Sequence, residues 1–430
     1  MKQSTLLLIW LFFANHLSSQ TTQQISAGTG YQKQSYVNLT AGTEKQVNNT
    51  AWDIAFSVDD VQHAGIFINE SAGSSMGTPQ PEVNVFYALT EDFNEEPTPG
   101  SLTDFQLFNS EKSWSYGAFN EIRDTTNAFD FGWGFYDDQT GQITGNAVYV
   151  IKLRNDQYLK LKVESLSGGI FTFKYANLDG TNEVIKTINK ADHSGKTLAY
   201  FSFETGNIVD VEPATGGFDL LYCRYYTPLL VPGTTDHIPY NVTGILSGPG
   251  IEVAEANGID PATVSYTTYQ DSLHTELNII GYEWKILSGF SFVLDQDLVF
   301  FLKTADDRVW KLRFTGFGGS STGVTTFEKT DLGIISAVEN PAAIGMQTLL
   351  YPNPVQDRLA VALDIPSGLG SQAQLSVIDL LGRTVAQQQV TLNEGFQVFE
   401  MAAQTWAAGA YVLNLKLAGG EVNLGKVVKN

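Results

Sequence analysis

The feature that most constrains the fold of this chain is an internal duplication. Four blocks recur in the same order in two parts of the sequence, with loops of different length between them. The matching pairs are 36–42 with 200–206, 52–56 with 218–222, 148–163 with 299–314, and 169–173 with 323–327. Chance agreement of four ordered blocks is improbable. The sequence therefore predicts two homologous domains in tandem, at residues 20–190 and 196–335.

The repeated blocks have the pattern of β-strands. Runs of β-branched and aromatic residues lie between Gly, Asn, Asp and Ser, and long helical periodicity is absent. The sixteen-residue block predicts a hairpin that turns around Asn155-Asp156 in one copy and Asp306-Asp307 in the other, because Asn and Asp tolerate turn conformations. The fold class expected is all-β, with two tandem antiparallel β domains.

Each copy also carries an Asp beside a large aromatic residue, in Trp52-Asp53 and Phe218-Asp219. Catalysis by paired carboxylates needs a second acid at a fixed distance, and no such partner stands out in the sequence. Asp53 and Asp219 are therefore expected to be turn or hydrogen-bonding residues.

Composition excludes some classes of partner. The chain has 46 Asp and Glu against 25 Lys and Arg, a formal net charge of −21. Such a surface repels phosphate backbones, so nucleic acid is not an expected partner. Cys223 is the single cysteine, which rules out an internal disulfide and favours a small buried apolar residue.

A run of alternating aromatic residues occurs in the first copy. Phe129, Phe131, Trp133 and Phe135 alternate with Asp130, Gly132 and Gly134. Because side chains alternate along a strand, all four aromatics are expected on one face. A strand facing the core is the first interpretation. An aromatic platform for a flat ligand or a sugar is the alternative.

The N-terminus has the pattern of a secretory signal peptide. Lys2 precedes a short apolar run from Leu6 to Ala14, and Ser18 and Ser19 provide small residues at a cleavage point. Residues 1–19 are therefore expected to be removed after export through the Sec machinery. The apolar run is too short to span a membrane.

The C-terminus predicts a small β-sandwich after a linker at residues 336–348. Pro352 and Pro354 exclude a helix and favour an extended entry followed by a turn. Alternating strands are expected at 359–363, 375–379 and 411–417. Their spacing is typical of an Ig-like β-sandwich over residues 349–430.

This segment resembles the type A sorting domain of the type IX secretion system of Bacteroidetes. The motif residues that carry the likeness are Tyr351, Pro352, Asn353, Pro354, Asp357, Gly382, Arg383, Gly409, Tyr411, Gly425 and Lys426. The resemblance implies export to the periplasm and recognition by the type IX outer-membrane translocon. Release, or anchoring to surface lipopolysaccharide, would follow.

The duplicated part resembles the HmuY family of bacterial haem-binding proteins. The segments 200–206, 218–225 and 299–314 carry this likeness, and the first copy shares it more loosely. It implies an all-β fold and haem held by two axial side chains, often His. His237 and His274 are the candidate pair within one copy, and His63 with Met76 is the alternative in the other. Haem is the one cofactor implied, and the residues by themselves require none.

Two classes of function stay open for the part that precedes the sorting domain. One is a surface protein that binds haem or another flat hydrophobic ligand. The other is an adhesive or carbohydrate-binding surface protein with no haem ligand. An enzyme is not expected, because no nucleophile elbow, HExxH motif or paired-acid signature is present.

Overall fold

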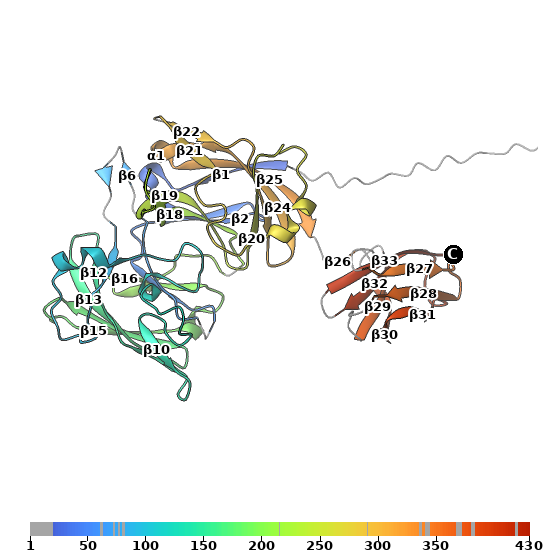
Figure 1. The fold of residues 1–430 in the computed structure, drawn as a ribbon, viewed down its shortest axis with the longest axis horizontal. Coiled ribbons are helices and arrows are strands. Elements are labelled where there is room, and N and C mark those ends of the chain that lie inside the picture. The colour runs from blue at the N-terminus through green and yellow to red at the C-terminus, as the bar shows by residue number, and fades with distance from the viewer. Residues whose placement is uncertain are drawn as a thin grey trace, which may run out of the picture. The chain divides into compact units, whose positions relative to one another are not determined.

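The computed structural model describes residues 20–430 except 61–62, 72–73, 76–77, 80–81, 215, 290, 335–337, 340–344, 367–371, 380–382 and 418–419. The predicted signal peptide at 1–19 lies outside the described residues. The chain divides into two compact units, one up to Gly333 and one from Ile334 to Asn430. Strands build both units, which confirms the all-β prediction (Figure 1).

The first unit contains two β-sandwiches. In the first sandwich, one sheet has the order β10-β11-β13-β12-β8-β9, and β14 and β15 extend it from β13. The facing sheet has the order β17-β16-β4-β5. The bounds are β4 Ile54–Ser57, β5 Ile66–Ile68, β8 Asn84–Tyr87, β9 Gln106–Leu107, β10 Gly134–Asp137, β11 Gln142–Gly145, β12 Val148–Lys152, β13 Tyr158–Ser167, β14 Ile170–Asn177, β15 Val184–Asn189, β16 Leu198–Ser202 and β17 Asn207–Val209.

The second sandwich takes its strands from both ends of the unit. One sheet has the order β1-β25-β24-β23-β20, and the other has the order β19-β18-β2-β3. The bounds are β1 Gln20–Ser26, β2 Lys33–Asn38, β3 Thr43–Asn48, β18 Leu220–Leu230, β19 His237–Ser247, β20 Glu252–Ala256, β23 Val299–Lys303, β24 Arg308–Phe317 and β25 Val324–Ile334.

Short elements complete the unit. They are the hairpins β6 Ser74–Ser75 with β7 Thr78–Pro79 and β21 Lys285–Ser288 with β22 Ser291–Leu294, the helix α1 Gly319–Thr322, and the 3-10 turns η1 Thr29–Tyr31, η2 Pro99–Ser101, η3 Thr103–Phe105, η4 Ala118–Asn120, η5 Lys190–His193, η6 Tyr266–Thr268 and η7 Gln270–Ser272.

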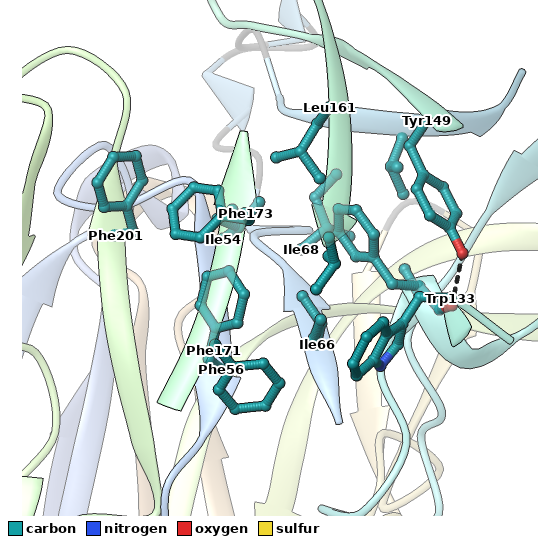
Figure 2. Packing of buried hydrophobic residues seen from close by; sticks show 14 of the residues in the cluster. Ile54, Phe56, Ile66, Ile68, Trp133, Tyr149, Leu161, Phe171, Phe173 and Phe201 are labelled. Carbon is teal, nitrogen blue, oxygen red and sulfur yellow. Dashed lines mark hydrogen bonds between the residues drawn. The ribbon is translucent and has the colours of Figure 1, made fainter. Parts of the chain in front are cut away.

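The core of the first sandwich is rich in aromatic side chains. Phe56 from β4 packs against Phe171 and Phe173 from β14, with ring centroids 5.2 and 5.0 Å away (Figure 2). The hydroxyl of Tyr149 is buried in the same core and donates to the carbonyl of Phe119 at 2.9 Å. Burial of these large side chains supplies most of the stabilising free energy that a chain without disulfides needs.

The two sandwiches pack face to face through their inner sheets. On β16, Ala199 and Phe201 enter the core of the first sandwich, whereas Leu198 and Tyr200 enter a separate apolar cluster. That cluster also holds Leu221, Cys223 and Tyr225 of β18. Because strand side chains alternate, β16 and the first part of β18 (residues 220–223) are buried on both faces. The prediction that Cys223 is buried is confirmed.

The repeated strands are exchanged between the two copies. Strand β2 of the first copy pairs with β18 of the second, and β16 of the second copy pairs with β4 of the first. At one outer sheet, β1 of the first copy pairs with β25 of the second. Pairing thus crosses the expected boundary between residues 190 and 196. Residues 20–190 and 196–335 do not fold as separate bodies, because a repeat identifies equivalent strands but not which copy each one joins.

Residues from equivalent positions meet where the inner sheets face each other. The hydroxyls of Tyr36 and Tyr200 lie 3.3 Å apart. The backbone N–H of Phe203 donates to Asp53 at 2.7 Å, and the N–H of Leu39 donates to Asp219 at 2.7 Å. The exchange is therefore reciprocal. These contacts confirm that Asp53 and Asp219 are hydrogen-bonding residues.

The predicted hairpins are confirmed as β12–β13 and β23–β24. Asp156 and Asp307 adopt left-handed backbone conformations, with φ of 62° and 59°. Each forms an ion pair with the Lys four residues before it, Lys152 at 2.8 Å and Lys303 at 3.2 Å. The two turns are thus alike in backbone and in side-chain contacts.

The predicted core strand at 129–135 is wrong. Strand β10 begins only at Gly134, and a tight turn with left-handed Gly132 precedes it. Trp133 is fully buried and Phe131 is partly buried, but Phe129 and Phe135 are 49% and 44% exposed. The turn breaks the alternation, so the four rings do not share a face.

The second unit is a sandwich of two sheets, with the orders β26-β33-β32-β29-β30 and β27-β28-β31. The bounds are β26 Val338–Glu339, β27 Gln347–Tyr351, β28 Arg358–Ile365, β29 Gln372–Asp379, β30 Thr384–Thr391, β31 Gly395–Ala402, β32 Gly409–Leu417 and β33 Gly420–Lys429. The expected linker at 336–348 contributes β26, which pairs in parallel with β33. Among the described residues, no helix is long and apolar enough to cross a membrane.

Candidate functional site

A groove of about 400 Å³ lies where a loop of the first sandwich meets strands β18 and β19 of the second. The loop contributes residues from 108 to 123. The two strands contribute Tyr226, Thr227, Pro228, His237 and Pro239. Clefts of this kind between two packed bodies are common sites for small ligands.

The loop is held in place by two asparagine side chains. Asn109 accepts a hydrogen bond from Ile68 N at 2.9 Å and donates to Ile68 O at 2.7 Å, which continues the pairing of β5. Asn120 is fully buried and accepts from Ile66 N at 3.0 Å while donating to Phe131 O at 2.8 Å. The loop is therefore attached to the edge of a buried strand.

A buried carboxyl group joins the loop to the second sandwich. Glu70 accepts hydrogen bonds from Asn109 N at 2.7 Å and from Tyr226 N at 3.3 Å. Burial raises the pKa of Glu70 to about 8, although both hydrogen bonds act in the opposite direction. Glu70 thus connects the two walls of the groove. Because its pKa is raised, the neutral form of its carboxyl group is favoured there.

The groove combines aromatic walls with charged groups. Phe108 packs on Tyr226 with ring centroids 4.8 Å apart, and the guanidinium of Arg123 lies 3.9 Å from the centre of the Tyr116 ring. Lys112, Glu111 and Glu121 also line it. Partial burial raises the pKa of Glu121. The arrangement suits a ligand with a flat face and hydrogen-bonding groups.

The predicted histidine pair does not line one pocket. His237 lines the groove at the start of β19. His274 lies outside it, where it bridges to Val253 of β20 and its ring is 3.7 Å from Glu276. Two imidazoles must converge on one iron in bis-histidine ligation, so this pair does not fit that arrangement in the groove.

The alternative pair falls partly outside the described residues. His63 contacts Asp59 at 3.0 Å, and Met76 lies outside the described residues. In the part of the chain that the structure describes, no group of three or more His, Cys, Asp and Glu residues could hold a metal ion.

Sequence reasoning missed most of the groove. Phe108, Tyr116 and Arg123 belong to a segment of the first copy that no repeated block covers, so the duplication gave no reason to single them out. The sequence does hold one indication of the groove, which is that these residues lie outside the repeat. Residues that the duplicated framework does not need are free to form a binding site.

The sorting motif joins the two ends of the second unit. Asn353 accepts a hydrogen bond from Val428 N at 2.9 Å and donates to Lys426 O at 2.9 Å. The neighbouring bonds Tyr351–Pro352 and Asn353–Pro354 are both cis. Asp357 accepts from Ala403 N through its backbone carbonyl. The start of the motif is thereby attached to the last strand of the chain.

Other motif residues also have structural contacts. Arg383 donates to Asp379 at 2.8 Å, and the Tyr411 hydroxyl donates to Ala407 O at 2.7 Å. Gly409 begins β32 opposite Lys429. Gly425 has a φ of 134° beside a bulge in β33, where a side chain would meet Leu350. Lys426 pairs with Val412, and Gly382 lies outside the described residues.

Comparison with solved structures gives little about the first unit. The structure of dimeric latent PorU from Porphyromonas gingivalis is similar at a TM-score of 0.17 and 9% identity, over 95% of this chain and 34% of that one. The chain thus spans about a third of the length of PorU, and a similarity this low carries no argument. No curated protein matches the chain.

The second unit has a clear relative. Residues 349–430 match the family model described as the secretion system C-terminal sorting domain. This match agrees with the sorting motif in the sequence and with the β-sandwich whose first and last strands that motif joins. The chain therefore ends in a sorting domain that engages the type IX secretion machinery, and it is exported by that route to the cell surface or into the medium.

Proposed function

We propose that the first unit is a non-catalytic binding protein that holds a small flat ligand in the groove between the two sandwiches. The observation that carries the proposal is the composition of the groove. The Phe108–Tyr226 ring pair and the Arg123–Tyr116 pair line a concave space of about 400 Å³. Flat apolar faces with a few convergent polar groups are typical of small-molecule sites.

Haem is the ligand to test first, because the resemblance to the HmuY family implies it. Among the described residues, His237 is the histidine that lines the groove, and it would be the side chain to reach iron. Arg123 and Lys112 are the cations available to acidic groups of a ligand. Since His274 lies elsewhere, two-histidine ligation is not part of the proposal.

Delivery to the surface would follow the steps that the sorting family implies. The signal peptide would direct the chain through Sec, and the sorting domain would then bring it to the outer membrane of a member of the Bacteroidetes. Release and attachment to lipopolysaccharide are the two outcomes that the resemblance allows. The binding unit would act outside the cell in either case.

The test is a titration of the mature chain with haem and with iron-free protoporphyrin, followed by absorbance and tryptophan fluorescence. We expect both to bind, because the ring faces provide most of the contact. His237→Ala should alter the iron-ligated spectrum and leave protoporphyrin binding intact. His274→Ala is the matched control and should change neither. Failure of both compounds to bind would overturn the proposal for flat tetrapyrroles.

A carbohydrate-binding function is the second candidate, and one surface favours it. The exposed rings of Phe129 and Tyr136 stack with centroids 5.9 Å apart and planes 16° from parallel, beside a depression of about 600 Å³. Aromatic faces of this kind bind the apolar face of a sugar ring. A glycan array with the mature chain and with Phe129→Ala tests this function. Signals that survive the substitution would count against it.

A further inference from the structure

The outer face of one sheet in the second unit is apolar. Strands β27, β28 and β31 form this sheet, and residues such as Val361 and Met401 turn into the core of the sandwich. Because strand side chains alternate, the residues between them point outward. Strand pairing arranges the outward residues in three rows, which are Tyr351–Ala360–Glu400, Leu349–Ala362–Val398 and Gln347–Asp364–Phe396.

Four large side chains of this face are exposed to solvent. Phe396 is 72% exposed and Leu349 is 62% exposed, while Val398 and Tyr351 are each 44% exposed. Single exposed apolar side chains are common on protein surfaces and need no explanation. Several on adjacent rows of one sheet face form a contiguous apolar patch, which is typical of a contact surface.

The other sheet of the same domain has a polar outer face. Two neighbouring rows cross β30, β29, β32 and β33 on its outer side. Their residues are Gln389–Gln374–Lys416–Glu421 and Gln387–Ser376–Asn414–Asn423. Solubility alone therefore explains the outer face of one sheet and does not explain the apolar face of the other.

The area of the apolar face restricts the kind of partner. Strands lie about 4.8 Å apart and outward residues repeat about every 7 Å, so three rows across three strands cover about 300 Å². A lasting dimer usually needs about 800 Å² on each partner. The face is thus too small to hold two copies together and suits a contact that forms and is then released.

One residue connects this face with the sorting motif. The motif side chains of Asn353, Arg383 and Tyr411 form hydrogen bonds within the domain. The Tyr351 side chain has no hydrogen bond or ring contact among the described residues, and it points outward on β27. Its ring is therefore available to a partner of the domain.

We propose that the outer face of β27, β28 and β31 is the surface by which the sorting domain docks on an apolar patch of the type IX machinery. The family match supplies the partner, because a domain that this machinery engages needs a surface for the contact. Phe396 and Leu349 enter the apolar centre of the contact, and the exposed Arg358–Glu400 ion pair lies at its polar rim. The inference goes beyond the ligand proposed for the first unit and does not depend on it.

The test measures export of the full chain in a Bacteroidetes strain whose type IX machinery exports the wild type. The chain is quantified in the periplasm, on the cell surface and in the medium. Phe396→Thr combined with Val398→Thr should lower the exported amount about 10-fold or more and leave the chain in the periplasm. The reason is that the loss of a large apolar side chain from the centre of a contact weakens binding by about this factor.

Matched variants separate docking from folding. Val398→Thr alone should lower export about 3-fold, because a hydroxyl replaces a methyl group in an apolar contact. Val385→Thr is its control, since Val385 is an exposed residue of β30 and should be exported like the wild type. Phe396→Leu keeps an apolar side chain and should restore export. All purified variants should unfold at the same denaturant midpoint as the wild type, because the substituted residues are exposed.

Three results would overturn the docking surface. The first is export of the Phe396→Thr and Val398→Thr double variant at the wild-type level. The second is an equal defect in Val385→Thr, which would assign the effect to threonine in a strand. The third is a concentration-dependent dimer of the mature chain that Phe396→Thr abolishes in sedimentation velocity, which would assign the face to a second copy.

Discussion

The two sandwiches of the first unit share the same framework of strands and turns, and they differ in the loops that the framework carries. Both use a Tyr from the duplicated block at their common boundary, an Asp that accepts a backbone N–H, and a left-handed Asp at the hairpin turn. The first sandwich alone supplies the loop at 108–123. Repeated residues thus build the fold, whereas residues outside the repeat build the groove.

The equivalent Asp residues show how the copies diverged. Asp53 forms an ion pair with Arg154 at 2.5 Å, and Arg154 also donates to Asn49 O at 2.9 Å. At the corresponding place in the second hairpin stands Ala305, so Asp219 lacks this partner. Burial raises the pKa of Asp53, and the positive charge of Arg154 partly opposes that effect.

The largest expected effect on stability comes from removing the Asp53–Arg154 ion pair, which the second copy lacks. Asp53→Ala removes the acceptor for Phe203 N and leaves the mostly buried Arg154 without its partner, so it should cost about 3–5 kcal/mol of unfolding free energy. Asp219→Ala removes the acceptor for Leu39 N and a negative charge that acts on Lys329, and it should cost about 1–3 kcal/mol. Denaturant titration of both variants measures the difference. Equal losses would show that Arg154 adds nothing.

A smaller effect is expected from the carboxyl group that joins the sandwiches. The pKa of Glu70 is raised to about 8, well above its value in an unfolded chain. Its contribution to stability is therefore fully present below about pH 4.5, the ordinary Glu value, and is lost as pH rises through 8. Glu70→Gln should flatten this loss and exceed the wild type by about 1 kcal/mol or more at pH 9.

Glu212 is the control for that pH profile. Burial raises its pKa to about 7, and it lies against β16 rather than between the walls of the groove. Glu212→Gln should therefore change the profile at lower pH than Glu70→Gln does. A Glu70→Gln chain with the same pH dependence as the wild type would contradict the assignment to Glu70.

The smallest expected effect concerns the Tyr36–Tyr200 contact. Tyr36→Phe and Tyr200→Phe each remove a hydroxyl from a buried network that includes Gln34 and Glu212. A double-mutant cycle should give a coupling of about 1 kcal/mol, the worth of one hydrogen bond. A coupling near zero would mean that the contact between equivalent residues does not help to hold the copies together.

The local elements could be predicted from sequence, but the way they combine could not. The hairpins around Asp156 and Asp307 and the roles of Asp53 and Asp219 follow from turn chemistry and from repetition. The exchange of β2 and β16 did not follow, because both copies offer the same strand pattern as a partner. Phe129 and Phe135 were misplaced because Gly132 turns the chain within the run.

Prediction of the site from sequence was limited in the same way. His237 was found because a family resemblance pointed to histidine, and the same reasoning also selected His274, which lies outside the groove. Arg123 and Tyr116 have no motif, and only the folded loop brings them opposite β18. The sorting domain was the easier case, since its motif residues form the contacts that close the sandwich.

The central claim is that the unrepeated loop, and not the duplicated framework, holds the ligand. Hydrogen exchange of the mature chain with and without saturating haem tests it most directly. We expect new protection within residues 106–123 and 226–239, and none in the loop of the second copy at 257–272. Protection at 257–272, or haem binding that leaves 106–123 unprotected, would contradict the claim.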